Sequence, residues 1–207
     1  MYFAVLPQSL TRHRILLNDG ASHLIEQNQT KNILNKDVMN IRKTISFSVG
    51  KGSLTHNRRD FIAQNVDSNR TQMNIEYCNE NLEQVYHQMF DDALQRFNDK
   101  QKRADRKIES YYDKIRTGKQ EKLFHEVIVQ IGNREDTNSK SADSEIAVRI
   151  LDEYMKHFQE RNPNLRIFSA HLHLDEETPH LHIDFVPFVT NSKRGLDTRV
   201  SLKQALL

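Results

Sequence analysis

Residues 173–182 read His-Leu-Asp-Glu-Glu-Thr-Pro-His-Leu-His, and they lie in a segment, Phe168 to Phe188, where polar and apolar residues alternate on both sides of a short connection. Strict alternation places every second side chain on the same face of a β-sheet. The connection Glu176–Pro179 has turn chemistry, and proline is tolerated where a strand begins. The segment therefore predicts a β-hairpin with histidines along one face.

The histidines of this hairpin share a phase. On the first strand His171 and His173 have the same parity, and on the second strand His180 and His182 do. Folding at the turn sets His173 opposite the second pair, whereas His171 is one pair further from the turn. His173, His180 and His182 are therefore the candidate ligands of a three-imidazole metal site. Acidic residues alternate with them, Asp175 among them, which suits orientation of ligating rings. A chance set of structural histidines is the alternative.

Length and composition describe a polar protein of one domain. The chain has 207 residues, enough to bury a hydrophobic core. Hydrophobic residues make up 37% and charged residues 28%, and no apolar run is long enough to span a membrane. A single cysteine, Cys78, excludes an internal disulfide, and the N-terminus lacks the layout of a secretory signal. We expect a cytoplasmic protein.

The charge distribution says more than the net charge of +2, which neither requires nor excludes a nucleic-acid partner. Basic residues gather between residues 100 and 122, and Lys102, Arg103 and Arg106 are central to this group. A solvated helix face is one interpretation. The functional interpretation is a surface that contacts DNA phosphates.

The remaining pattern places the hairpin in an α+β fold. Residues 1–38 show no sustained period, so we expect a disordered or spurious N-terminal extension, followed by one domain over residues 39–207. Periodicity predicts strands and helices in the order strand, helices, strand, helix and hairpin. The predicted elements are strands at 44–49 and 123–131, helices at 82–97, 108–115 (with Gly118 as C-cap) and 141–160, and a helix starting after Ser201. A mostly antiparallel sheet covered by helices on one face follows.

Three boxes of sequence resemble one known family. His173 to His182, followed by Val186-Pro187-Phe188, closely resembles the third motif of the plasmid mobilisation relaxases of the Mob/Pre type. His56-Asn57-Arg58-Arg59 resembles their first motif. Asn74-Ile75-Glu76-Tyr77 resembles the second, from which Ile75 and Tyr77 depart. The boxes occur in the family's order and span residues 44 to about 188.

The resemblance implies an HUH-endonuclease-like fold and a reaction. Such relaxases nick one DNA strand at a transfer origin, stay covalently attached to its 5′-phosphate and later rejoin it. By resemblance, His173, His180 and His182 bind a divalent metal, Mn²⁺ or Mg²⁺. His56 is the nucleophile, and Glu176 orients or deprotonates it. Residues 39–207 would be the relaxase catalytic domain, truncated at its C-terminal end.

The resemblance also implies partners and supporting residues. Asn57, Arg58 and Arg59 are expected near DNA, and Asp175, Asn74 and Glu76 are expected to support the ligands from outside the metal site. The expected partner is DNA at a transfer origin, with a homodimer formed through C-terminal helices beyond this chain. Because the chain stops inside a predicted helix, a truncated, non-catalytic DNA-binding remnant is the alternative function.

Overall fold

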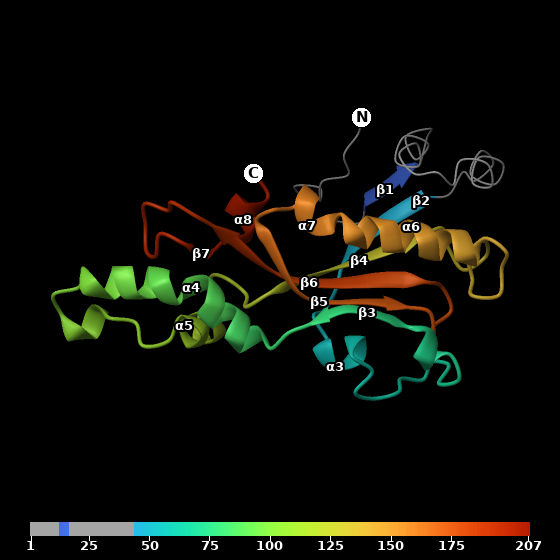
Figure 1. Ribbon diagram of the computed structural model, residues 1–207, viewed down its shortest axis with the longest axis horizontal. Coiled ribbons are helices and arrows are strands. Elements are labelled where there is room, and N and C mark those ends of the chain that lie inside the picture. The colour runs from blue at the N-terminus through green and yellow to red at the C-terminus, as the bar shows by residue number, and fades with distance from the viewer. Residues whose placement is uncertain (1–12, 17–43) are drawn as a thin grey trace.

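The computed structural model describes residues 13–16 and 44–207 (Figure 1). The strands are β1 (His13–Leu16), β2 (Thr44–Val49), β3 (Ile75–Asn79), β4 (His125–Ile131), β5 (Leu165–His173), β6 (His180–Val189) and β7 (Arg199–Val200). The α-helices are α3 (Leu54–Asn57), α4 (Leu82–Asp99), α5 (Tyr111–Thr117), α6 (Ser144–Lys156), α7 (Phe158–Arg161) and α8 (Leu202–Ala205). Two 3-10 turns, η1 (Thr71–Met73) and η2 (Ala104–Arg106), lie in the connections.

The predicted hairpin forms the middle of the sheet. The strand order is β1-β2-β4-β6-β5-β3, β7 pairs with β6, and all of these pairings are antiparallel. In the β5–β6 register His173 faces His180, and His171 faces His182. Because β6 and β5 are flanked by β4 and β3, the histidines stand on interior strands whose backbone is fixed by hydrogen bonds on both sides.

One face of the sheet carries the main hydrophobic core. Alternate residues of the central strands, Ala170, Leu172, Leu181 and Ile183 among them, are fully buried there. They pack against the apolar stripe of α6 and the adjoining α7 and α8, which lie above the sheet in Figure 1. The predicted antiparallel sheet with helices packed on this face is confirmed.

The opposite face, which we call the histidine face, is divided between two structures. At one end α4 and α5 form a second cluster against the sheet residues Phe168 and Val186. A register shift between Ile167 and Ser169 in β5 accompanies this change of packing. At the other end α3 lies over the histidines. This face is therefore less open than the sequence pattern indicates.

Several predicted elements can be compared with the structure directly. The strand at 44–49 and the helix starting at Leu82 form as predicted, but the helix expected over 141–160 is two helices, α6 and α7, interrupted at His157. Gly118 does cap α5, in an extended conformation with a φ of −74°. None of the helices in residues 44–207 has the length and apolarity to cross a membrane.

The predicted N-terminal extension, residues 1–38, lies mostly outside the described residues and stays a prediction. Strand β1 falls within it and pairs with β2.

Candidate functional site

Three histidine rings from β5 and β6 converge on the histidine face. The ring centroids of His173 and His182 are 4.6 Å apart, those of His180 and His182 are 4.9 Å apart, and those of His173 and His180 are 5.3 Å apart. His173 and His182 are almost completely buried. The alternation read from the sequence thus brings the three predicted ligands together. His171 lies further along the same face, with its ring centroid 6.3 Å from that of His173.

Each of these rings has one nitrogen next to an oxygen that can only accept a hydrogen bond. The pairs are His173 Nε2 with the Asn57 carbonyl (2.9 Å), His180 Nδ1 with the Thr178 carbonyl (2.8 Å) and His182 Nδ1 with Glu126 Oε1 (2.6 Å). A carbonyl or carboxylate oxygen requires an N–H donor, so the tautomer of each neutral ring is fixed. The second nitrogen of each ring then presents a lone pair.

Those second nitrogens are what a metal ion needs. His173 Nδ1 and His182 Nε2 are buried and make no hydrogen bond within the part of the chain that is described. Burial and the neighbouring His182 lower the pKa of His173 to about 2, and burial also lowers the pKa of His180. Both rings are therefore neutral at pH 7 and need not lose a proton before they bind a metal. The donor set fits a divalent cation.

Glu126 on β4 is a member of the site that the sequence pattern does not reveal. It is 3% exposed and accepts hydrogen bonds from His182, from Asn57 Nδ2 (2.9 Å) and from the Gly52 backbone N–H (2.7 Å). Burial alone would raise the pKa of Glu126, but these three donors outweigh it, and the pKa is lowered. A Cβ on Gly50 would lie 1.8 Å from Glu126 Oε2, so this loop needs glycine there. The signal in the sequence is a lone acid inside an apolar strand.

Replacing Glu126 with glutamine is expected to weaken Mn²⁺ binding by roughly 10–100-fold, because removing the partner of a ligating histidine loses ring orientation and basicity. Isothermal titration with MnCl₂ measures the change. Glu145→Gln, an exposed glutamate on α6 of the other face, is the matched control and should bind Mn²⁺ normally. Equal affinity of the Glu126 variant and wild type would show that Glu126 does not orient a ligand.

His56, on the short helix α3, stands beside the three rings. Its ring centroid is 5.6 Å from that of His173 and 5.8 Å from that of His182. Its Nε2 is 3.2 Å from Glu176 Oε1, and its side chain is 23% exposed. Burial and the Arg59 guanidinium lower the pKa of His56, so the ring is neutral at pH 7. His56 is thus a partly open, neutral imidazole at the rim of the metal site.

Arg59 connects His56 to the β5–β6 turn. Its guanidinium donates to Asp175 (2.6 Å) and to Glu176 (2.8 Å), and its backbone has a positive φ of 59°, which is strained for arginine. Asp175 also accepts from Thr71 and Asn74, and these donors with Arg59 offset the effect of burial and hold the pKa of Asp175 well below its usual range. Among the described residues, the side chain of Asp175 bonds to these three and to no histidine ring, so Asp175 orients Arg59.

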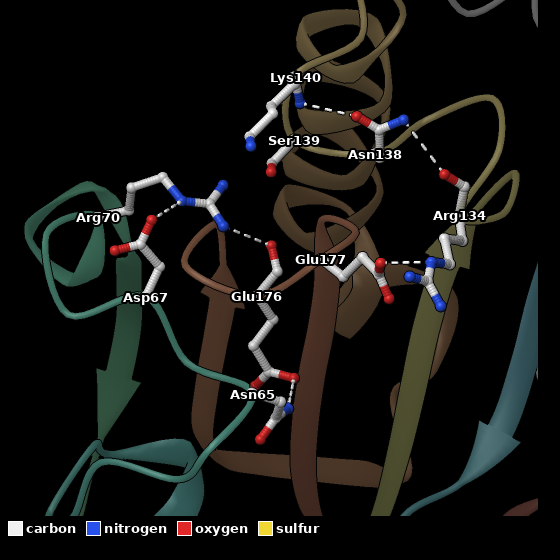
Figure 2. Close-up of a pocket in the computed structure, with 9 residues that line it drawn as sticks. All are labelled: Asn65, Asp67, Arg70, Arg134, Asn138, Ser139, Lys140, Glu176 and Glu177. Carbon is white, nitrogen blue, oxygen red and sulfur yellow. Dashed lines mark hydrogen bonds and ion pairs between the residues drawn. The ribbon is translucent and has the colours of Figure 1, made fainter.

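Glu176 lies between this cluster and a pocket of about 530 Å³. One carboxylate oxygen faces His56 and Arg59, and the other accepts from Asn65 at 2.5 Å (Figure 2). Three cations line the pocket. Arg70 pairs with Asp67 and Arg134 with Glu177, whereas Lys140 forms no ion pair with any described residue. Lys140 is therefore a cation available to an anionic ligand near Glu176.

The residues predicted to contact DNA lie in two different parts of the structure. Asn57, expected at DNA, is 2% exposed, and its amide donates to Glu126 and Asp184, so its role is to tie α3 to the sheet. Arg58 is half-buried in the same helix end. Lys102, Arg103 and Arg106 lie in the turn between α4 and α5, at the end of the molecule distant from α3 (Figure 1).

The two residues of the second motif, Asn74 and Glu76, have different positions relative to the site. Asn74 accepts from the Leu174 N–H (2.7 Å) and donates to Asp175, so it supports the β5–β6 turn. Glu76, on the edge strand β3, has a side chain that is 57% exposed and lies 3.9 Å from His171 Nδ1. Glu76 therefore lies outside the three-histidine cluster.

Comparisons with known proteins give the family of this chain. One similar solved structure is the MobM relaxase domain bound to 22-nucleotide oriT DNA of plasmid pMV158, a Mn-bound crystal structure at pH 5.5. Its sequence is 23% identical to this chain, the TM-score is 0.44, and the match covers 73% of each chain. The pH 4.6 structure of that complex is 22% identical, with a TM-score of 0.46, 78% of this chain and 76% of that chain covered. No curated protein matches the chain. The family model described as plasmid recombination enzyme matches residues 54–206, which contain α3 and all three histidines. The chain belongs to the plasmid recombination enzyme (Mob/Pre) family of relaxases.

Proposed function

We propose that this chain is a metal-dependent relaxase that nicks and rejoins one DNA strand at a plasmid or mobile-element transfer origin, through a 5′-phosphohistidine on His56. The observation that carries the proposal is a pair of buried ring nitrogens, on His173 and His182, that make no hydrogen bond within the described residues. Beside them lies His56, a neutral histidine that contacts Glu176. Membership of the relaxase family supports the choice of DNA as substrate.

His173, His180 and His182 would hold a divalent ion. Three neutral imidazoles leave the full charge of the ion uncompensated, and when bound it polarises a phosphoryl oxygen as a Lewis acid. Of the two ions expected from the sequence, Mg²⁺ prefers oxygen ligands and keeps several waters, so a site of three imidazoles disfavours it. We therefore propose Mn²⁺ as the cofactor of this chain.

In the nicking step His56 is the nucleophile and Glu176 is the proton acceptor. The lone pair of one His56 nitrogen forms the bond to phosphorus, and the bond from phosphorus to the 3′-oxygen breaks. Attack leaves the ring positively charged, and Glu176, 3.2 Å from Nε2, can accept the Nε2 proton and restore neutrality. The 3′-oxygen leaves as a hydroxyl after it takes a proton from solvent. The reverse sequence rejoins the strand.

Two tyrosines of the described residues, Tyr77 and Tyr86, are alternative nucleophiles, and both hydroxyls are engaged elsewhere. The Tyr86 hydroxyl is buried and donates to the Leu123 carbonyl at 2.6 Å. The Tyr77 hydroxyl donates to Asp152 at 2.8 Å, and Tyr77 packs against the main core on the face opposite the histidines. Burial raises the pKa of both hydroxyls. These facts support His56 as the attacking residue.

The function is tested with the full chain and a single-stranded oligonucleotide that carries the cognate origin. With MnCl₂ we expect one specific nick, with protein attached to the 5′-phosphate of the downstream fragment, and with EDTA no nick. DNA binding without cleavage under both conditions would favour the non-catalytic remnant instead. A homodimer stays a prediction, and sedimentation of the same sample tests it.

Phosphate binding is proposed at the Lys102, Arg103 and Arg106 turn and at Lys140. Removing one cation that binds a phosphate should reduce the log–log salt slope of DNA binding by about one unit. Lys140→Ala is therefore expected to reduce it by about one, and the triple alanine variant by up to about three. Affinity measured at several NaCl concentrations gives the slopes. An unchanged slope in the triple variant would mean that this turn faces away from DNA.

A further inference from the structure

Phe61 is an exposed aromatic residue at the rim of the site. Its side chain follows α3 in an irregular loop and is 49% exposed, and Ile62 beside it is 55% exposed. Of the large hydrophobic residues exposed to this degree in the described part of the chain, Phe61 is the one aromatic. An exposed aromatic ring beside a candidate site offers its face to a ligand.

The ring of Phe61 lies next to the proposed nucleophile. Its centroid is 6.2 Å from that of His56, at an interplanar angle of 52°. Successive nucleotides of one strand are about 3.4 Å apart along B-DNA, so 6.2 Å is a span of about two nucleotides. A base lying on the exposed ring of Phe61 would therefore belong to a nucleotide beside the phosphate that His56 attacks.

The backbone before Phe61 is held in place. The Arg59 N–H donates to the His56 carbonyl (3.1 Å), and the Asp60 N–H donates to the Thr55 carbonyl (2.9 Å). The Arg59 guanidinium is in addition paired with Asp175 and Glu176. Because the chain leaves α3 through fixed hydrogen bonds, Phe61 is set at the rim before any ligand binds, and a preorganised ring loses little entropy on binding.

The surroundings favour a nucleobase as the occupant. Arg58 and Arg59 precede Phe61 in the sequence, and the ring of the proposed nucleophile, His56, lies beside the ring of Phe61. Single-stranded DNA is bound by this combination of cations for the phosphates and aromatic rings for the bases. We propose that Phe61 is the stacking platform for the nucleobase that flanks the scissile phosphate, a role that rests on the proposed function because it assumes a DNA strand at His56.

The test pairs protein variants with oligonucleotides. Phe61→Ala should weaken binding of the single-stranded origin oligonucleotide by about tenfold, whereas Phe61→Trp should retain affinity. In a series of oligonucleotides with one abasic position each, wild type should lose affinity at a single position next to the nick. On that oligonucleotide Phe61→Ala and wild type should bind equally. Fluorescence anisotropy in EDTA, where no cleavage is expected, gives the affinities.

Controls separate this proposal from the proposed function. Met73→Ala removes a similarly exposed hydrophobic residue on η1 and should bind like wild type. Because binding is measured without metal, the result holds even if wild type proves unable to nick DNA. If Phe61→Ala binds like wild type, or loses the same factor on every abasic oligonucleotide, the stacking role is overturned.

Discussion

Replacing His56 with alanine is expected to remove the covalent protein–DNA adduct and to slow nicking by at least ~10³-fold, since no nucleophile remains. The effect on DNA binding should be small, because other side chains are proposed to bind the phosphates. His56 is partly exposed on a short helix, so the variant should fold. Gel analysis of the denatured reaction with a labelled oligonucleotide measures the adduct, and anisotropy measures binding.

His157→Ala is the control for the His56 variant. His157 has a half-exposed side chain at the junction of α6 and α7, and its substitution should change neither quantity. An adduct that forms at the wild-type rate without His56 would remove this residue from the reaction. A loss of DNA binding equal to the loss of adduct would show a role in binding instead.

Replacing His180 with alanine is expected to reduce Mn²⁺ affinity by more than roughly 100-fold, because one of three ligands disappears. Losing only a residue that hydrogen-bonds to a ligand costs at most about 100-fold. His180 is chosen because its side chain is 12% exposed, more than that of His173 or His182, so the fold should tolerate the change best. Titration calorimetry with MnCl₂ measures affinity, and melting without metal checks folding.

His171→Ala is the matched control for His180→Ala. It removes a histidine from the same sheet face and the same hairpin, one pair further from the turn. Its Mn²⁺ affinity should equal that of wild type. Equal losses in both variants would mean that the metal site extends along the strand and that His173, His180 and His182 are not the ligand set.

The hairpin and its histidine phase can be predicted because they are local. Alternation over Phe168 to Phe188 fixes which side chains share a face, and the short turn fixes the register that sets His173 opposite His180. The stripe that begins at Leu82 likewise predicts α4, since apolar residues three and four apart make one buried face.

The features that escape sequence reasoning depend on interactions between distant segments. Asn57 reaches Asp184 across 127 residues, and Glu126 reaches His182 across 56, and no local period reports such pairs. Alternation in the sequence pairs Asp175 with a histidine ring, whereas the fold brings Arg59 to it. The cover of α4 and α5 on the histidine face depends in the same way on where the chain returns.

The most direct test of the proposed mechanism is the identity of the residue that carries the DNA. The adduct formed with Mn²⁺ is digested with protease, and the peptide attached to the 5′-phosphate is identified by mass spectrometry after exposure to acid or to alkali. We expect the peptide that contains His56, with a P–N bond that acid breaks and alkali spares. An acid-stable adduct, or a peptide that carries the phosphate on Tyr77 or Tyr86, would contradict the mechanism.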